Sequence, residues 1–374
     1  MSYNLTFYKV KTIFRLLILI SVSLVLAQKV VAQEDMKLLV GADFDTYFDN
    51  REYTGCSVGT SQTLFSSRLT PTIGVEWNKY NRLMFGMDLW SHCGDDTQTF
   101  AKARPQVYYQ FASDKVTAAA GFFSRDKLKG DYTEIIFSDS VRFYENRLQG
   151  LMGQYRGDRG FVELALDWYG MYSYASREKF RILSAGRYYF DKNNHHFYGG
   201  YAFQMGHYAG SETVSNCVVD NIIVLPHVGA RFSAFMDFDL SLHYVQTMQR
   251  DRANEEHSCF PKGVMLKAKI EKWGAYIDEQ LFVGDNLQPY YSSYRDERFP
   301  FGYGGDLYAG ERFFGSEGGV YSNTKIGYSN SFFSNTVSLN AYIALQYDGY
   351  KLGNKQVVSL SVKLLKDISI KKER

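Results

Sequence analysis

The stretch "TVSLNAYIALQYDG", from Thr336 to Gly349, alternates between apolar and polar side chains almost without error. One parity is apolar and the other is mostly polar: Val337, Leu339, Ala341, Ile343, Leu345 and Tyr347 against Ser338, Asn340, Tyr342, Gln346 and Asp348. A period of two indicates a β-strand with two different faces. In a soluble protein the apolar face points into the core, but in a membrane barrel it points outward to lipid. The function therefore depends on which arrangement holds.

The first 32 residues have the parts of a secretory signal peptide. A basic stretch that ends at Arg15 precedes the apolar run Leu16 to Ala27, and small residues favour cleavage after Ala32 or, almost as well, after Ala27. The apolar run has about 12 residues, fewer than the roughly 20 that a membrane-spanning helix needs. The sequence therefore predicts an exported chain, with a signal peptide at 1–32 and a single domain at 33–374.

Composition favours a membrane barrel over a soluble protein. The chain has 30 Tyr and 28 Phe, which make it 17% aromatic, and only 6 Pro. Two aromatic girdles at the membrane interfaces would use many Tyr and Phe residues, and long paired strands tolerate few prolines. The formal net charge of +2 gives no support to a nucleic-acid-binding surface.

Similar alternation recurs along the chain, and helical spacing does not fit it. The clearest further examples are Val162 to Trp168, Phe238 to Tyr244, Val264 to Lys272 and Val358 to Leu364. Short and long connections tend to alternate between such segments, and no internal repeat suggests a β-propeller. Seven short and eight long connections would join sixteen strands. The sequence predicts an all-β, transmembrane antiparallel up-and-down β-barrel of about 16 strands, with short periplasmic turns and longer extracellular loops.

Charges of both signs occupy the parity opposite the apolar one. Such charges are hard to place in a soluble core, where each would need a buried partner. In a barrel of about 16 strands they would line an aqueous channel. The candidate pore-lining residues are Asp43, Asp45, Asp88, Glu163, Asp167, Asp239, His243, Lys267, Lys269, Glu271 and Lys363.

These features together resemble a general outer-membrane β-barrel protein of porin-like size. The resemblance covers the whole mature chain and is architectural, without a family-specific motif. It implies the outer membrane of a diderm bacterium, contact with outer-membrane lipid, and small hydrophilic solutes as the transported partners. A homo-oligomer or a surface partner also fits. Such barrels commonly end on an aromatic residue, whereas this chain ends at Arg374.

All four cysteines fall in or beside the predicted outward loops. They are Cys56, Cys93, Cys217 and Cys259. Four cysteines allow three pairings, and the exported compartment permits oxidation. Neighbouring loops favour disulfides between Cys56 and Cys93 and between Cys217 and Cys259.

The longest loop, Asn286 to Gly318, is too aromatic for a disordered linker. Its most prominent residues are Tyr290, Tyr291, Tyr294, Arg295 and Arg298. Two hypotheses fit this composition. The loop folds into the barrel mouth and narrows the pore, or it stands outward as a docking surface.

Evidence for catalysis is sparse. No GxxxxGK[ST], HExxH or CxxC motif occurs, and we expect no metal site and no cofactor. A phospholipase would need Ser and His near the outer end of a strand with an Asn or acid to orient the His. The stretch "HSC" from His257 to Cys259 lies in a long loop, without a partner that its position would supply. An outer-membrane protease would use acids and histidines of the rim, such as His92, Asp95, Asp96 and His207.

The sequence thus predicts a porin-like channel for passive diffusion of small hydrophilic solutes, without enzymatic activity. The first alternative is a non-conducting barrel whose extracellular loops bind a partner or ligand. The second alternative is an outer-membrane hydrolase, either a phospholipase or a protease.

Overall fold

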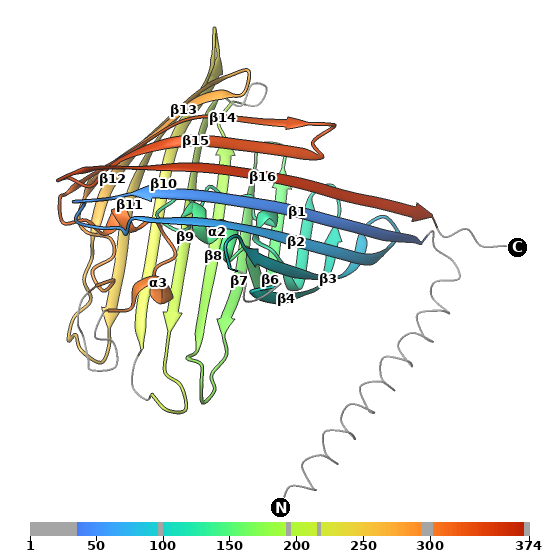
Figure 1. Ribbon diagram of the computed structural model, residues 1–374, viewed down its shortest axis with the longest axis horizontal. Helices are drawn as coiled ribbons and strands as arrows, with labels where there is room; N and C mark the ends of the chain where they lie inside the picture. Colours follow the sequence, from blue (N-terminus) through green and yellow to red (C-terminus); the bar gives the residue numbers. More distant parts are fainter. Residues whose placement is uncertain (1–35, 96–99, 192–195, 215–217, 293–301, 370–374) are drawn as a thin grey trace, which may run out of the picture.

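The computed structural model describes residues 36–95, 100–191, 196–214, 218–292 and 302–369. The predicted signal peptide at 1–32 lies outside these residues. Sixteen strands in the described part of the chain form a closed antiparallel barrel, in which each strand pairs with the next and the last pairs with the first (Figure 1). The predicted fold class and strand count are confirmed.

The strands follow one another around the barrel in chain order. They are β1 (Lys37–Glu52), β2 (Gln62–Trp77), β3 (Asn81–His92), β4 (Lys102–Ala112), β5 (Val116–Ser124), β6 (Arg147–Gly157), β7 (Gly160–Gly170), β8 (Lys179–Tyr189), β9 (Phe197–Tyr208), β10 (Val219–Ser233), β11 (Asp237–Asp251), β12 (Lys262–Lys272), β13 (Ala275–Gly284), β14 (Val320–Phe332), β15 (Val337–Tyr347) and β16 (Leu352–Ser369). Four short helices lie in two of the connections: η1 (Arg125–Lys127), α2 (Asp139–Tyr144), α3 (Gly304–Leu307) and η2 (Arg312–Gly315). No helix in the described ranges is long and apolar enough to cross a bilayer.

Strand β15 has the two faces that its sequence predicts. Ile343 and Leu345 point outward and are 53% and 39% exposed, whereas Tyr342 and Gln346 point inward and are buried. Exposed apolar side chains of this kind occur on the outer face of every quarter of the barrel. The apolar parity therefore faces outward, as in a membrane barrel.

The short turns gather at the end of the barrel where β1 begins and β16 ends. Several of them use the left-handed backbone region, for example at Asn78 and Lys79, with φ of 44° and 65°, and at Trp273 and Gly274, with φ of 55° and 89°. Turns of this kind match the twist of two adjacent strands. We call this end the short-turn end and the opposite end the outer mouth.

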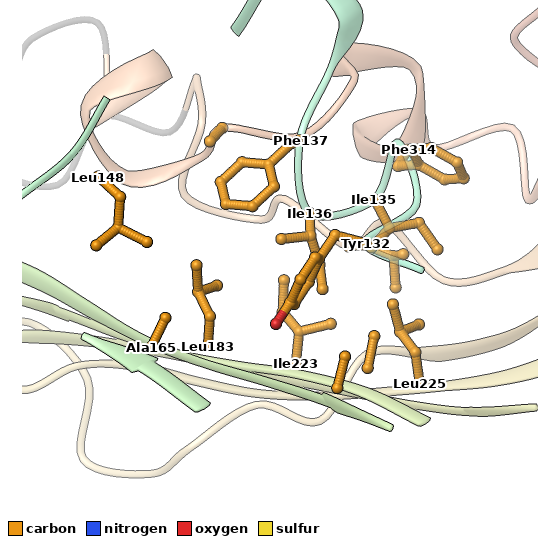
Figure 2. Close-up of a cluster of buried hydrophobic side chains, with 14 of the residues drawn as sticks. Tyr132, Ile135, Ile136, Phe137, Leu148, Ala165, Leu183, Ile223, Leu225 and Phe314 are labelled. Carbon is orange, nitrogen blue, oxygen red and sulfur yellow. The ribbon is translucent and has the colours of Figure 1, made fainter. Parts of the chain in front are cut away.

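Two of the long connections fold into the barrel instead of projecting from it. The first inner segment, residues 125–146, places the side chains of Tyr132, Ile135, Ile136 and Phe137 against the inner wall (Figure 2). The wall contributes Ala165, Leu183, Ile223 and Leu225 from β7, β8 and β10, and all of these side chains are almost fully buried. This part of the lumen is therefore a packed apolar core.

The second inner segment consists of residues 285–292 and 302–319. Phe313 and Phe314 are buried, and Phe314 belongs to the same apolar cluster as the first inner segment (Figure 2). Backbone hydrogen bonds join the two segments, because the Ser138 N–H donates to the Ala309 carbonyl at 2.9 Å and the Glu311 N–H donates to the Glu134 carbonyl at 2.7 Å. The two segments form one body inside the barrel.

The described part of the longest loop thus lies inside the barrel mouth. Tyr290 is 2% exposed, and the Tyr303 hydroxyl donates to Asp251 on the wall at 2.6 Å. Tyr291 stacks near Tyr308, at 6.2 Å between ring centroids. Tyr294, Arg295 and Arg298 fall outside the described residues. This inward position is what the first hypothesis requires, and narrowing of a pore by the loop stays a prediction.

Candidate active site

The eleven predicted pore-lining residues all occupy inward-facing positions, and most of them bind other residues. Four hold the first inner segment: Asp167 accepts from Arg125 at 2.9 Å, Glu163 accepts the N–H groups of Lys129 and Gly130 at 2.8 and 2.7 Å, Lys267 lies 3.5 Å from Asp131, and Lys363 lies 3.7 Å from Asp126. Others pair along the wall: Asp45 with Arg68, Asp88 with Arg147, Asp239 with Arg231, and Lys269 with Glu271. The buried members thus compensate one another and the inner segment, whereas the side chains of Lys269, Glu271 and Lys363 are 39%, 48% and 55% exposed.

A buried ion-pair network fixes both inner segments to the wall of β14 and β16. Lys325 pairs with Glu134 and, at 2.9 Å, with Asp139, both in the first segment. Lys355 lies 3.5 Å from Asp139 and 3.4 Å from Glu311 in the second segment. Burial disfavours a charged carboxyl, yet Lys325 and Lys355 outweigh it and hold the pKa of Asp139 well below its usual range. Asp139 therefore stays ionised and anchors the start of α2.

A serine and a histidine meet at the outer mouth, on the inner wall. Ser66 near the start of β2 and His92 at the end of β3 are directly opposite in the strand register. The Ser66 Oγ lies 2.7 Å from the His92 Nδ1. Ser66 is 2% exposed, whereas His92 is exposed to the mouth. This is the spacing that a nucleophile and its general base require.

Tyr144, the last residue of α2, completes the contacts of Ser66. Its Oη lies 2.9 Å from the Ser66 Oγ, and its ring stacks on Trp90 at 5.8 Å between centroids. Burial raises the pKa of Tyr144, so the phenol keeps its proton at neutral pH. When Ser66 donates to His92, Tyr144 donates to Ser66. The first inner segment thus supplies one member of the site.

A buried carboxylate lies beside this group. Asp49 accepts from the Tyr47 hydroxyl at 3.0 Å and pairs with Arg51 at 2.6 Å. The Tyr47 ring packs edge-on against Tyr144 at 6.1 Å. Asp49 forms no hydrogen bond with Ser66 or His92, and its negative charge adds to the burial that raises the pKa of Tyr144. The arrangement offers a nucleophile, a base and a phenolic donor.

The second serine–histidine pair of the barrel is enclosed. Ser241 and His243 on β11 lie 2.9 Å apart, and the His243 ring is 4.6 Å from that of His227. Ser241 is 7% exposed and His243 is fully buried. A lipid ester cannot reach this pair while the inner segments are in place, so the Ser66 pair is the better candidate.

Of the residues proposed for a protease rim, His92 and Asp95 meet through the backbone, and His207 does not join them. His207 lies on the outward parity of β9 and stacks on Phe180 at 4.8 Å, whereas His92 faces inward. Asp96 falls outside the described residues, and the Asp95 N–H donates to the His92 carbonyl. His257 is exposed in the β11–β12 loop, and Cys259 next to it contacts Gln249 and Tyr290. The "HSC" stretch forms no catalytic group in the described part of the loop.

The predicted disulfide between Cys56 and Cys93 is absent from the structure. Both residues and Cys259 carry free thiols, and Cys217 falls outside the described residues. Among the described residues no group of three or more His, Cys, Asp or Glu side chains is placed to hold a metal ion.

A protein-family model described as lipid A 3'-O-deacylase-type matches residues 30–365. This chain belongs to the lipid A 3'-O-deacylase-type family. Membership corrects the prediction that the chain is not an enzyme, because the family is named for a hydrolytic activity. The candidate site could not be recognised from the sequence, because Ser66 and His92 are 26 residues apart and meet only through strand pairing.

This deacylase-type chain also resembles solved outer-membrane porins. OccK11 of Pseudomonas aeruginosa is 9% identical, with 88% of this chain and 96% of that chain covered and a TM-score of 0.51. OccAB4 of Acinetobacter baumannii is 9% identical over 89% and 99%, with a TM-score of 0.49. A Rhodopseudomonas blastica porin triple mutant is 12% identical over 87% and 100%, with a TM-score of 0.43. No curated protein matches the chain. The barrel fold shared with OccK11 supports an outer-membrane location.

Proposed function

We propose that this chain is an outer-membrane ester hydrolase that removes an ester-linked acyl chain from a lipid A-type glycolipid. The hydrogen bond between Ser66 Oγ and His92 Nδ1 carries the proposal. It lies at the outer mouth, the end that faces away from the periplasm in the predicted topology. The lipid A acyl esters named by the family would be presented at that surface.

In the proposed reaction, Ser66 is the nucleophile and His92 is the general base. The Ser66 oxygen attacks the ester carbonyl while its proton passes to His92 Nδ1. The tetrahedral intermediate then breaks its bond to the sugar oxygen, which takes the proton from His92. Water, deprotonated in turn by His92, attacks the acyl–Ser66 ester and releases the fatty acid. Each step conserves protons, and no further reactant is needed.

Tyr144 assists the same step as a hydrogen-bond donor. It donates to Ser66 before attack, and this bond orients the lone pair that reacts. As the bond from Ser66 Oγ to the carbonyl carbon forms, the Tyr144 hydroxyl becomes free to donate to the negatively charged oxygen of the tetrahedral intermediate, where a preorganised donor has its largest effect. Because Asp139 is bound by Lys325 and Lys355, α2 holds this donor rigidly.

Passive diffusion ranks below hydrolysis as a function for this barrel. The strand count would permit an aqueous channel. However, the side chains of Ile135, Ile136 and Phe137 fill the lumen next to the β7–β10 wall (Figure 2). A path for solutes through this region would require the first inner segment to leave its place.

The test is acyl release from lipid A by the full chain in mixed detergent micelles, followed by mass spectrometry of the lipid and the free fatty acid. We expect Ser66→Ala and His92→Ala each to lower the rate by roughly a thousandfold or more. The matched control is Ser67→Ala, because Ser67 is the next residue of β2 and lies on the outward parity. Full activity of Ser66→Ala would remove Ser66 as the nucleophile. No acyl release by the unaltered chain would remove the function itself.

A further inference from the structure

Two apolar hollows lie on the outward face of the barrel, on either side of β9 and near the short-turn end. The first has a volume of about 400 Å³ and is lined by Tyr155, Val162, Tyr188 and Tyr201 together with several glycines. The second has a volume of about 550 Å³ and is lined by Phe190, Phe197, Val228, Leu240 and Leu266. Both are shallow depressions that open to the outside of the barrel along their length and so would not enclose a ligand.

Glycines on the outward parity form the floor of the first hollow. In the strand register, Gly186 of β8 lies between Val162 and Tyr201, and Gly199 of β9 lies opposite Tyr188. A Cβ at Gly186 would lie 2.9 Å from the Tyr201 ring, and one at Gly199 would lie 3.0 Å from the Phe190 ring. The absence of side chains at these two positions lets the aromatic walls stand close to the backbone.

An arginine lies at one end of the first hollow, the end nearest the short turns. Arg159 lies in the β6–β7 short turn and lines this hollow. It donates from Nη1 to the Tyr188 hydroxyl at 3.2 Å, and it forms no ion pair with the described residues around it. Its charge is therefore available to an anion at the membrane interface. Arginine pairs with phosphate oxygens through more than one N–H.

We propose that the two hollows hold the two acyl chains of one phospholipid of the periplasmic leaflet, with its phosphate on Arg159. The hollows are adjacent, since one is lined by Gly199 and Tyr201 and the other by Phe197 and Tyr198 of the same strand. Both open outward where exposed apolar residues face lipid, and the cation lies at the level of the periplasmic headgroups. Each hollow would take one of the two acyl chains, and Arg159 would bind the phosphate. The proposal is independent of the hydrolytic function.

The test is native mass spectrometry of the purified chain in detergent with added phosphatidylglycerol. The variants are Val162→Trp, which fills the first hollow, and Arg159→Gln. The matched control is Val264→Trp on β12, because Val162 and Val264 both face outward and are 45% exposed, while Val264 lines neither hollow. We expect one retained lipid per chain, at least tenfold weaker retention in Val162→Trp, severalfold weaker retention in Arg159→Gln, and no change in Val264→Trp.

Equal lipid retention in Val162→Trp and Val264→Trp would overturn the proposal. A chain dimer that is lost only in Val162→Trp would also overturn it, because a second copy would then be the occupant of this face. Acyl release from lipid A, measured on the same samples, is expected to stay unchanged in all three variants. Loss of lipid binding and loss of hydrolysis are thus read separately.

Discussion

Replacing Phe137 by alanine tests whether the lumen is a packed core. Phe137 is 1% exposed and belongs to the apolar cluster of the first inner segment (Figure 2). Truncation of a buried Phe to Ala costs about 3–5 kcal/mol through lost apolar burial and the remaining cavity. The guanidinium of Arg125 lies 4.5 Å from the centre of the ring, and a desolvated contact of this kind contributes about 0.5–2 kcal/mol of that loss. We expect Phe137→Ala to lower the free energy of unfolding by about 3–5 kcal/mol.

The assay is urea unfolding of the full chain in detergent micelles, followed by tryptophan fluorescence. Hydrogen exchange of the Ser138 N–H, which donates to Ala309, reports the same loss locally. The matched control is Phe235→Ala, because Phe235 lies in the β10–β11 short turn and is 69% exposed. We expect that control to change stability by less than about 1 kcal/mol. If Phe137→Ala cost no more than the control, Phe137 would face water and the lumen would not be packed.

Three further predictions concern the site and its supports. Tyr144→Phe keeps the ring on Trp90 and removes the donor to Ser66, so kcat for acyl release should fall roughly ten- to a hundredfold with little change in KM or in unfolding. Burial opposes ionisation of Asp131, but Lys267, His243 and Arg187 outweigh it and lower its pKa to about 2. Asp131→Asn should therefore lower the free energy of unfolding by about 2 kcal/mol at pH 7. This difference from the unaltered chain should vanish as the pH falls from about 4 to about 2, as measured by urea unfolding across that range. Lys325→Met leaves Glu134 buried without its cation and should cost about 3–5 kcal/mol of unfolding free energy, against at most about 1 kcal/mol for the exposed control Lys363→Met.

Much of the barrel could be predicted from local patterns. The parity of Val337, Leu339 and Ile343 places them outward, and every short turn falls at one end as the connection lengths suggest. A period of two is a property of neighbouring residues, so strands can be recognised from it without knowledge of the fold. The inner segments have no such pattern. From sequence, residues 125–146 resemble one more extracellular loop, because their apolar side chains follow neither the period of a strand nor that of a helix. Their spacing fits the side chains of the inner wall that they contact.

The candidate site could not be predicted because its members lie on three separate stretches of chain. Ser66 and His92 meet through the register of β2 and β3, and Tyr144 arrives from a connection three strands away. The chemical requirement of a serine and a histidine near the outer end of a strand pointed to His257, because that histidine has a serine next to it in sequence. Adjacency in sequence is a poor guide on strands, where neighbouring residues face opposite sides.

The inward-facing charges supported a channel as long as their partners were unknown, but their partners in the structure support a filled lumen. Mixed charges on the inward parity exclude an uncompensated apolar core, but they do not distinguish water from a complementary protein surface. On the wall, Asp167 binds Arg125, Glu163 binds the backbone N–H of Gly130, and Lys267 pairs with Asp131. The charges of the wall are therefore complementary to the segment that fills the barrel. A sixteen-stranded barrel is wide enough for a channel, yet the same width admits a folded insert that carries α2 across the lumen and sets Tyr144 beside Ser66. Strand number therefore fixes the size of the space, and the inserted segments decide what that space does.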